Sequence, residues 1–368
     1  MSHSNNEFGG YRGRRTITDI LKLIAIALAV AVVLVVAGLF FLQRYIVYTD
    51  DGPRLDLPPL FRTDGGVSSS APLPGREDIS LIERPAGSQS EPVVPPEPAG
   101  FALQLSVDQV ADGSAAARLE EAGAKAVILE MKDRNGRLSW YSEQELAGRA
   151  KVNARQQLND VLRQWNEGKV YTIARVCCFR DDSLPYYRNS LALRRGEYNW
   201  RDELGLRWVS PAQEKAQAYI AGLCAELAAL GFDEIVLEQF HFPIRGNLDN
   251  INRGGSYDPE QFTAGVEALL SQVGQALEPY ETKLSLRVER DTLTGAESSS
   301  GVTDALLEQY AARVWVESDG RLPGPENLLE QAGITGGTER LVLIAAQPED
   351  TPVFQGILPV ENGEETGR

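Results

Sequence analysis

The feature that most constrains this chain is a repeated alternation of short apolar runs and helix-like segments from residue 101 onward. Short runs rich in Val, Ile and Leu are typical of strands in a parallel sheet, because helices cover both faces of such a sheet. We expect strands at 101–107, 126–131, 170–179, 234–240, 283–289, 312–317 and 340–345.

Helix signals separate most of these runs. Ser114 can cap a helix that ends near Gly123, because serine oxygens accept from free N–H groups and glycine adopts the left-handed conformation at a helix end. A second helix is expected over 153–167. Two further helix starts are predicted where a capping residue is followed by proline, at Ser210–Pro211 and Asp258–Pro259. Short helices fit two later segments, 303–311 and 324–332.

Strands that alternate with helices predict a parallel sheet with right-handed crossovers. Seven to eight such units over about 270 residues fit a (β/α)8 TIM-like barrel, and a doubly wound open sheet is the alternative. An eighth strand fits 354–360, but the segment before it is too short for a helix. We therefore expect an α/β barrel whose eighth unit is incomplete.

An uninterrupted apolar segment lies near the N-terminus. Residues 23–42 contain no charged residue, and twenty helical residues span a hydrocarbon layer of about 30 Å. Basic residues precede this segment, so the positive-inside bias predicts a cytoplasmic tail at 1–22 and a C-terminal domain outside the cell. The alternative is a cleaved signal peptide, but the run exceeds the usual apolar core and ends in bulky residues.

Proline marks the next segment as a linker. Residues 50–98 hold ten of the twenty prolines, and proline favours extended, semi-rigid chain. We expect a Pro/Ser-rich linker at 43–98 and a single barrel domain at 99–368.

The net charge of −16 lies mostly in that domain, which argues against nucleic-acid binding, because such binding needs clustered Lys and Arg.

Other chemistries have little support. Three cysteines, Cys177, Cys178 and Cys224, are an odd number and fit buried apolar positions better than a disulfide framework. His3 and His241 are the only histidines, so a histidine metal site is not expected. The chain has no glycine-rich phosphate loop, and we expect no cofactor.

Acidic residues gather at the expected carboxyl ends of the strands, where the active sites of β/α barrels lie. Glu130 and Asp133 follow the second strand, Glu238 the fourth and Glu289 the fifth. Two carboxylates that flank one sugar bond can hydrolyse it, one as the acid and the other as nucleophile or base. Aromatic rings in the nearby loops could stack on sugars: Trp140, Tyr141, Tyr186, Tyr187, Trp200 and Trp208.

Four segments resemble a known family in the same order. They are AKAVILEMKDRNGRLSWYSE (124–143), VYTIARVCCFRDDSL (170–184), YNWRDELGLRWVSP (198–211) and LGFDEIVLEQFHFP (230–243). These are similar to segments of the bacterial "putative glycoside hydrolase" barrel family, related to the α-amylase-like hydrolases. The resemblance implies an extracytoplasmic barrel that acts on carbohydrate.

The resemblance also implies roles for individual residues. The suspected catalytic aspartate of the family falls on Glu238, and its K-D-D motif falls on 132–134, where Arg134 replaces the second aspartate. His241 stands where the family has arginine, and Ser210 where it has aspartate. We take Glu238, Glu289 and Asp133 as the candidate catalytic residues. Arg175 is expected to bridge barrel carboxylates, and it joins the candidate substrate-binding residues, which are Lys132, Arg175, Trp200, Trp208 and His241.

Two hypotheses follow. In the first, the protein is a membrane-anchored glycoside hydrolase that acts on a polysaccharide of the cell envelope or the surroundings. In the second, the barrel has lost its chemistry and serves as a carbohydrate-binding or envelope scaffold module. A hydrolase needs two carboxylates that face one cleft, and a binding module needs an aromatic-lined groove. An ion pair between Glu238 and Arg175 would weaken the first hypothesis.

Overall fold

The computed structural model describes residues 46–49, 52–55, 100–295, 299–318 and 327–359. The chain divides into two compact units, Met1–Gln89 and Ser90–Arg368. The described part of the first unit is an antiparallel hairpin of β1 (Ile46–Thr49) and β2 (Gly52–Leu55), at the start of the expected linker. No helix among the described residues is long and apolar enough to cross a membrane, and the expected span at 23–42 lies outside them.

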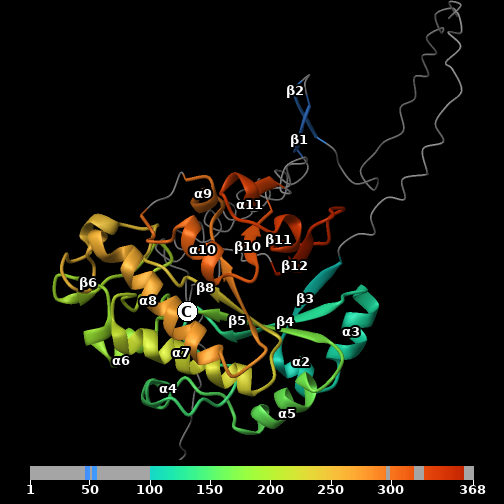
Figure 1. Ribbon diagram of the computed structural model, residues 1–368, viewed down its shortest axis with the longest axis horizontal. Helices are drawn as coiled ribbons and strands as arrows, with labels where there is room; N and C mark the ends of the chain where they lie inside the picture. The colour runs from blue at the N-terminus through green and yellow to red at the C-terminus, as the bar shows by residue number, and fades with distance from the viewer. Residues whose placement is uncertain (1–45, 50–51, 56–99, 296–298, 319–326, 360–368) are drawn as a thin grey trace, which may run out of the picture. The chain divides into compact units, whose positions relative to one another are not determined.

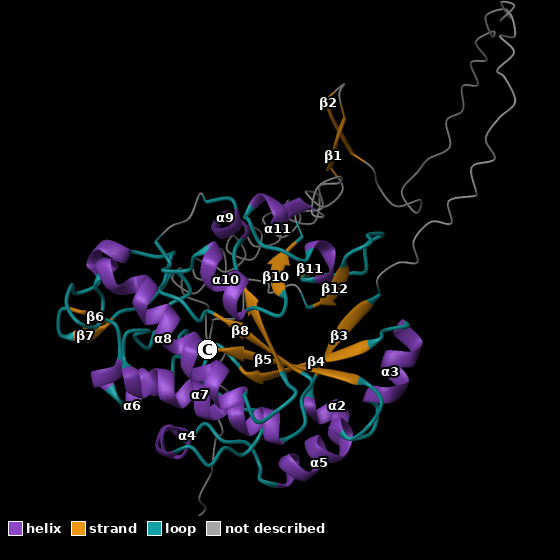
Figure 2. Ribbon diagram, viewed as in Figure 1, coloured by secondary structure: helices purple, strands orange, loops and turns teal. Residues whose placement is uncertain are grey.

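The second unit is built on eight parallel strands that close into a barrel (Figures 1 and 2). In chain order the strands are β3 (Phe101–Leu105), β4 (Ala126–Lys132), β5 (Tyr171–Cys177), β8 (Glu234–Glu238), β9 (Lys283–Arg287), β10 (Val314–Glu317), β11 (Leu341–Ala345) and β12 (Phe354–Ile357). The last strand pairs with the first, with Gly356 opposite Ala102. The prediction of a TIM-like barrel is confirmed, and the doubly wound alternative is wrong.

Each expected strand is present, including the eighth. No helix separates β11 from β12 in the described segment between them, as the short spacing predicted. The helices lie outside the strands, which Figure 2 shows as purple elements around the orange barrel. They are α2 (Val107–Ala111), α3 (Ala115–Ala122), α4 (Glu145–Ala150), α5 (Gln157–Asn166), α6 (Leu184–Tyr187), α7 (Glu214–Ala229), α8 (Phe262–Leu277), α9 (Arg290–Leu293), α10 (Asp304–Tyr310) and α11 (Leu328–Gln331).

Three helix starts differ from the prediction, and at two of them the expected capping side chain bonds elsewhere. Asn153 exchanges two hydrogen bonds with the backbone of Ser142, and the helix after it begins at Gln157. Ser210 donates to the carbonyl of Ser256 and accepts from the N–H of Ala212, which forms a turn, and α7 begins only at Glu214. The cap at Asp258 starts a 3-10 turn, Pro259–Gln261, and α8 follows it.

Alternation along the strands divides the buried residues into two layers. In β4, Val127, Leu129 and Met131 belong to the large core between strands and helices. Ala126 and Ile128 belong to a second cluster inside the barrel. Because side chains of a strand point alternately to opposite faces, this pattern also determines which polar residues face the barrel interior.

Candidate active site

Polar residues of six strands meet inside the barrel near its carboxyl end. The inward-facing positions of β5 pass from Ile173 to Arg175, and those of β8 from Val236 to Glu238, so each strand changes from apolar to charged toward its end. Register places Arg175 next to Val236 and Cys177 next to Glu238. The same alternation brings in Gln104 from β3, Glu130 from β4, Arg287 from β9 and Glu317 from β10.

Glu238 is the centre of this group. Its Oε1 accepts from Arg175 Nε at 2.9 Å and from Arg287 Nη1 at 2.8 Å. Its Oε2 accepts from Arg175 Nη2 at 2.9 Å. Arg287 also donates to Glu317 at 2.7 Å, and Arg175 donates to Gln104. Glu238 is thus held by two guanidinium groups that neighbouring strands position, and the bridging role expected of Arg175 is confirmed.

Burial and charge act in opposite directions on the pKa of Glu238. Burial alone would raise this pKa, because removal from water disfavours the charged form. The positive charges and hydrogen bonds of Arg175 and Arg287 outweigh burial and lower the pKa to about 2. Glu238 is therefore ionised at neutral pH although only 7% of its surface is exposed.

The backbone directly after Glu238 is in an uncommon conformation. Gln239 has φ of +49°, and outside glycine only one other described residue, Lys151, has a positive φ. The N–H of Phe179 donates to the carbonyl of Gln239, which fixes this turn against the end of β5. Left-handed conformations of non-glycine residues cost about 1–3 kcal/mol and are concentrated at functional sites.

A cavity of about 280 Å³ opens over Glu238. Among the described residues of its wall, most are charged, with five glutamates and five arginines: Glu130, Glu203, Glu238, Glu289, Glu317, Arg134, Arg175, Arg180, Arg245 and Arg287. Several of these form ion pairs across the wall, among them Arg245 with Glu289 at 3.1 Å and Arg180 with Glu203 at 3.0 Å. The arrangement brings several carboxylates to one cleft, as glycoside hydrolysis requires.

The candidate catalytic residues do not all reach this cavity. Glu289 lines it beside Glu238, and its side chain is 32% exposed. Asp133 is not part of the wall. Its Oδ1 accepts from the backbone N–H groups of Asn135 at 2.9 Å and Arg137 at 2.8 Å, so it closes the turn after β4. The structure brings Glu238 and Glu289 together and places Asp133 in a loop role.

The candidate substrate-binding residues are mostly enclosed by protein. Lys132 is buried and donates to the carbonyl of Cys177 at 2.7 Å and to Asp181 at 2.9 Å. Trp200 is 1% exposed and donates to the carbonyl of Asn247, and Trp208 is 2% exposed. Neither ring presents a face on which a sugar can stack, so that expected role does not fit their burial.

His241 is also enclosed. Its exposure is 4%, its Nδ1 lies 2.7 Å from the carbonyl oxygen of Phe242, and its ring meets Phe240 edge-on.

The three cysteines are free and buried, as expected. Burial raises the pKa of the Cys177 thiol to about 12. No group of His, Cys, Asp and Glu that could hold a metal ion occurs among the described residues.

Arg287 is the main site residue that sequence reasoning missed. Its signal is the period of two in β9, where Ser285 and Arg287 face inward and Leu284 and Leu286 face the helices. Reasoning from residue type directed attention to the carboxylates that follow the strands. Arg287, which lies within β9 before Glu289, could be found only from the alternation of side chains along the strand.

Comparison with protein families identifies the barrel. A family model described as a putative glycosyl hydrolase domain matches residues 109–300, just over half of the chain. The chain belongs to this family. The matched part covers β4, β5, β8 and β9, which carry Glu130, Arg175, Glu238 and Arg287. The part of this chain that matches the putative glycosyl hydrolase domain family thus includes Glu238, and the resemblance inferred from the four segments is confirmed.

Parts of the chain are also similar to solved structures at low sequence identity. A hypothetical protein from Ruminiclostridium thermocellum is 20% identical, with 50% of this chain and 96% of that chain covered and a TM-score of 0.43. The spore cortex-lytic enzyme SleL of Bacillus megaterium is 11% identical, with 68% and 52% covered and a TM-score of 0.38. The glycoside hydrolase domain of a PelA variant from Pseudomonas aeruginosa is 16% identical, with 67% and 83% covered and a TM-score of 0.36. A search of curated proteins found no match.

Proposed function

We propose that this protein is a membrane-anchored glycoside hydrolase that cleaves a polysaccharide on the outer side of the membrane. The observation that carries the proposal is a cavity at the carboxyl end of the barrel whose wall holds two carboxylates, the buried Glu238 and Glu289. Family membership gives the reaction class, and the apolar segment 23–42 supports the anchor.

Each carboxylate has a defined part in the reaction. Glycosidic bond cleavage passes through a transition state with positive charge on the sugar ring. Glu238, ionised at neutral pH, stabilises that charge or attacks the anomeric carbon from one side. Glu289, once it has taken up a proton, donates it to the departing oxygen as the bond breaks. It then takes a proton back from the water molecule that supplies the new hydroxyl. Arg245, its partner, is 64% exposed, and ion pairs of exposed groups are worth only about 0–1 kcal/mol, so Glu289 can leave this pair.

The experiment uses the full-length protein in detergent micelles with a panel of plant, fungal and bacterial polysaccharides. Released oligosaccharides are measured by mass spectrometry. Glu238→Gln and Glu289→Gln should each reduce product release by at least about a hundredfold. Glu281→Gln is the matched control, because Glu281 is exposed in the segment before β9, at the opposite end of that strand. Cleavage that persists in both active-site variants would contradict the proposal.

A second candidate function is a polysaccharide-binding module without catalysis. The three hydrogen bonds that Glu238 accepts from Arg175 and Arg287 favour it, because a carboxylate so held is a weaker nucleophile. Against it, Trp208 is the one aromatic residue among the described residues that line the cavity, and it is 2% exposed. Binding without product, unaffected by Glu238→Gln, would establish this alternative.

A further inference from the structure

A second cavity lies next to the Glu238 cleft and has no part in the chemistry proposed above. Its volume is about 600 Å³, roughly twice that of the cleft. It is formed where β3 and β4 end, between the start of α2, the segment before α5 and the residue Pro359 after β12. Binding sites for small organic ligands measure about 300–1,000 Å³, so this cavity has a suitable size and the cleft alone is at the lower limit.

Glu130 joins the two cavities, because it lines both. Its side chain is 41% exposed, and its carboxylate lies 3.7 Å from Arg175. Gln104, in the wall of the second cavity, accepts from Arg175, which in turn donates to Glu238. Glu130 and the hydrogen bonds from Arg175 to Gln104 and Glu238 therefore connect the wall of the second cavity with that of the cleft.

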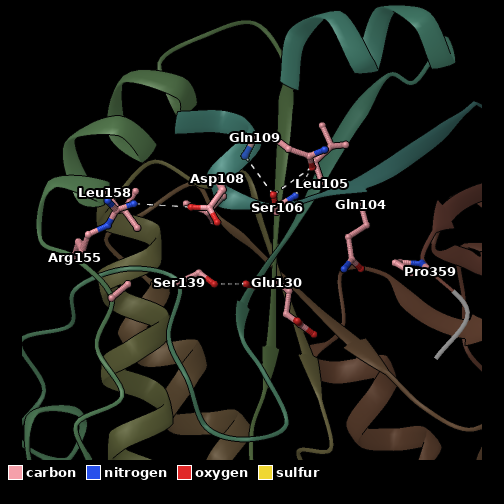
Figure 3. Close-up of a pocket in the computed structure, with 12 residues that line it drawn as sticks. Gln104, Leu105, Ser106, Asp108, Gln109, Glu130, Ser139, Arg155, Leu158 and Pro359 are labelled. Atoms are coloured by element: carbon pink, nitrogen blue, oxygen red, sulfur yellow. Dashed lines mark hydrogen bonds and ion pairs between the residues drawn. The ribbon is translucent and has the colours of Figure 1, made fainter. Parts of the chain in front are cut away.

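The lining of the second cavity combines apolar and polar groups. Figure 3 shows Gln104, Glu130 and Pro359 around one side and Asp108 and Arg155 on the other. The remaining wall includes further aliphatic side chains and the hydroxyl groups of two serines: Leu105, Val107, Ala154, Leu158, Ser106 and Ser139. A pyranose ring has apolar C–H faces and a hydroxyl rim, so aliphatic surface bordered by hydrogen-bonding groups fits it.

We propose that the second cavity binds the sugar units next to the cleaved bond, so that the protein holds several consecutive units of one polysaccharide. This inference rests on the proposed function in one respect, namely that a glycan enters the Glu238 cleft. It adds that Glu130 lies under the polysaccharide chain, between the two subsites. A site for single sugars would need only the smaller cleft.

Two variants test the second cavity without touching the Glu238 group. Asp108→Trp places a large ring at the rim of the cavity, and the side chain of Asp108 is 85% exposed, so the substitution leaves the core intact. Arg155→Ala removes a polar group from the same rim, and the side chain of Arg155 is 76% exposed. Glu120→Trp, on the exposed face of the neighbouring α3, is the matched control because it lies outside the cavity wall.

The measurement is the dissociation constant of full-length protein for oligosaccharides of one to six units, determined by calorimetry. The probes are β-1,4-linked glucose, mannose, N-acetylglucosamine and glucosamine series. In the unmodified protein, affinity for at least one series should rise about tenfold or more between two and four units. Asp108→Trp should remove most of that increase and leave the affinity for the shortest bound oligosaccharide unchanged, and Glu120→Trp should keep the increase.

The outcomes separate this inference from the proposed function. A length dependence that Asp108→Trp abolishes, together with absent product release, would support the second cavity and contradict the hydrolase. A length dependence that is the same in Asp108→Trp and in the unmodified protein would overturn the inference while cleavage through Glu238 stands. Affinity that does not rise beyond one unit, or no binding in any series, would also overturn it.

Discussion

At the scale of single residues, the site depends on how Glu238 is kept charged inside the barrel. Burial opposes its ionised form, and the two arginines that flank it more than compensate, so its pKa falls to about 2 from an ordinary value of 4.5. The folded state therefore binds fewer protons at this group than the unfolded state does between these pH values. The group contributes stability that is fully present above pH 4.5 and is lost as pH falls toward about 2.

The first prediction follows from that sign. Glu238→Gln leaves Arg175 and Arg287 without their shared partner, and breaking a buried ion pair typically costs about 3–5 kcal/mol at neutral pH. As pH falls below 4.5, the unmodified protein loses the stability that ionised Glu238 contributes. The difference in free energy of unfolding between the two proteins should then shrink by roughly 3 kcal/mol. Urea unfolding at several pH values measures the difference. A gap that stays constant from pH 7 to pH 2.5 would show that the charge of Glu238 does not stabilise the fold.

A second buried carboxylate, Glu234, provides a contrast. It begins β8 as Glu238 ends it, is fully buried, and accepts from Trp315 Nε1 at 3.1 Å and from Tyr171 at 3.0 Å, with Arg313 as its ion-pair partner. In β/α barrels the active-site residues lie at the carboxyl ends of the strands, and the residues at the amino ends contribute to stability.

The second prediction is that Glu234→Gln destabilises the protein by about 3–5 kcal/mol, because Arg313 loses a buried partner. Product release per folded molecule should remain within about threefold of the unmodified protein, since the change lies away from the reacting groups. Urea unfolding and the oligosaccharide assay, run on the same preparations, check the two parts. A hundredfold loss of activity would mean that the amino end of the barrel also shapes the cleft.

At the scale of elements, the strands could be predicted from the sequence, whereas the polar contacts between side chains of neighbouring strands could not. All eight strands could be located because each is a short apolar run, and β12 was identified although no helix precedes it. Helix starts were less accurate, since Asn153 and Ser210 bond to distant backbone groups that sequence spacing does not reveal. Glu238 was found from the segment that resembles the family, at the end of the fourth expected strand. Arg287, the second arginine that donates to Glu238, could be found only from strand register.

The third prediction concerns β12, which must pack closely at Gly356. A Cβ at this position would overlap the ring of Trp315, which is 1% exposed and cannot move into solvent. Gly356→Ala should therefore lower the free energy of unfolding by about 1–3 kcal/mol. Gly274→Ala is the control, because Gly274 lies within α8 with open space around its Cβ position, and alanine there should stabilise by about 0.5–1 kcal/mol. Equal effects of the two changes would indicate that β12 tolerates extra volume.

At the scale of the whole molecule, the proposal joins an acidic barrel to a membrane through the segment 23–42 and a proline-rich linker. The fourth prediction is that the full-length protein sediments with membranes and resists extraction by high salt, because twenty apolar residues partition into lipid. Deletion of residues 23–42 should leave it in the soluble fraction. Protease added to intact cells should digest the barrel domain of the full-length protein; protection of that domain would contradict the proposed orientation.

The pairing of β12 with β3 joins the two ends of the barrel domain. A ribosome makes β3 first and β12 last, so the ring of strands cannot close until the chain has been synthesised past Ile357. Until then β3 and β11 each expose an unpaired edge that can bind another chain. Closure of the barrel is therefore a late step of folding, because it needs contact between the first and the last barrel strand of the domain.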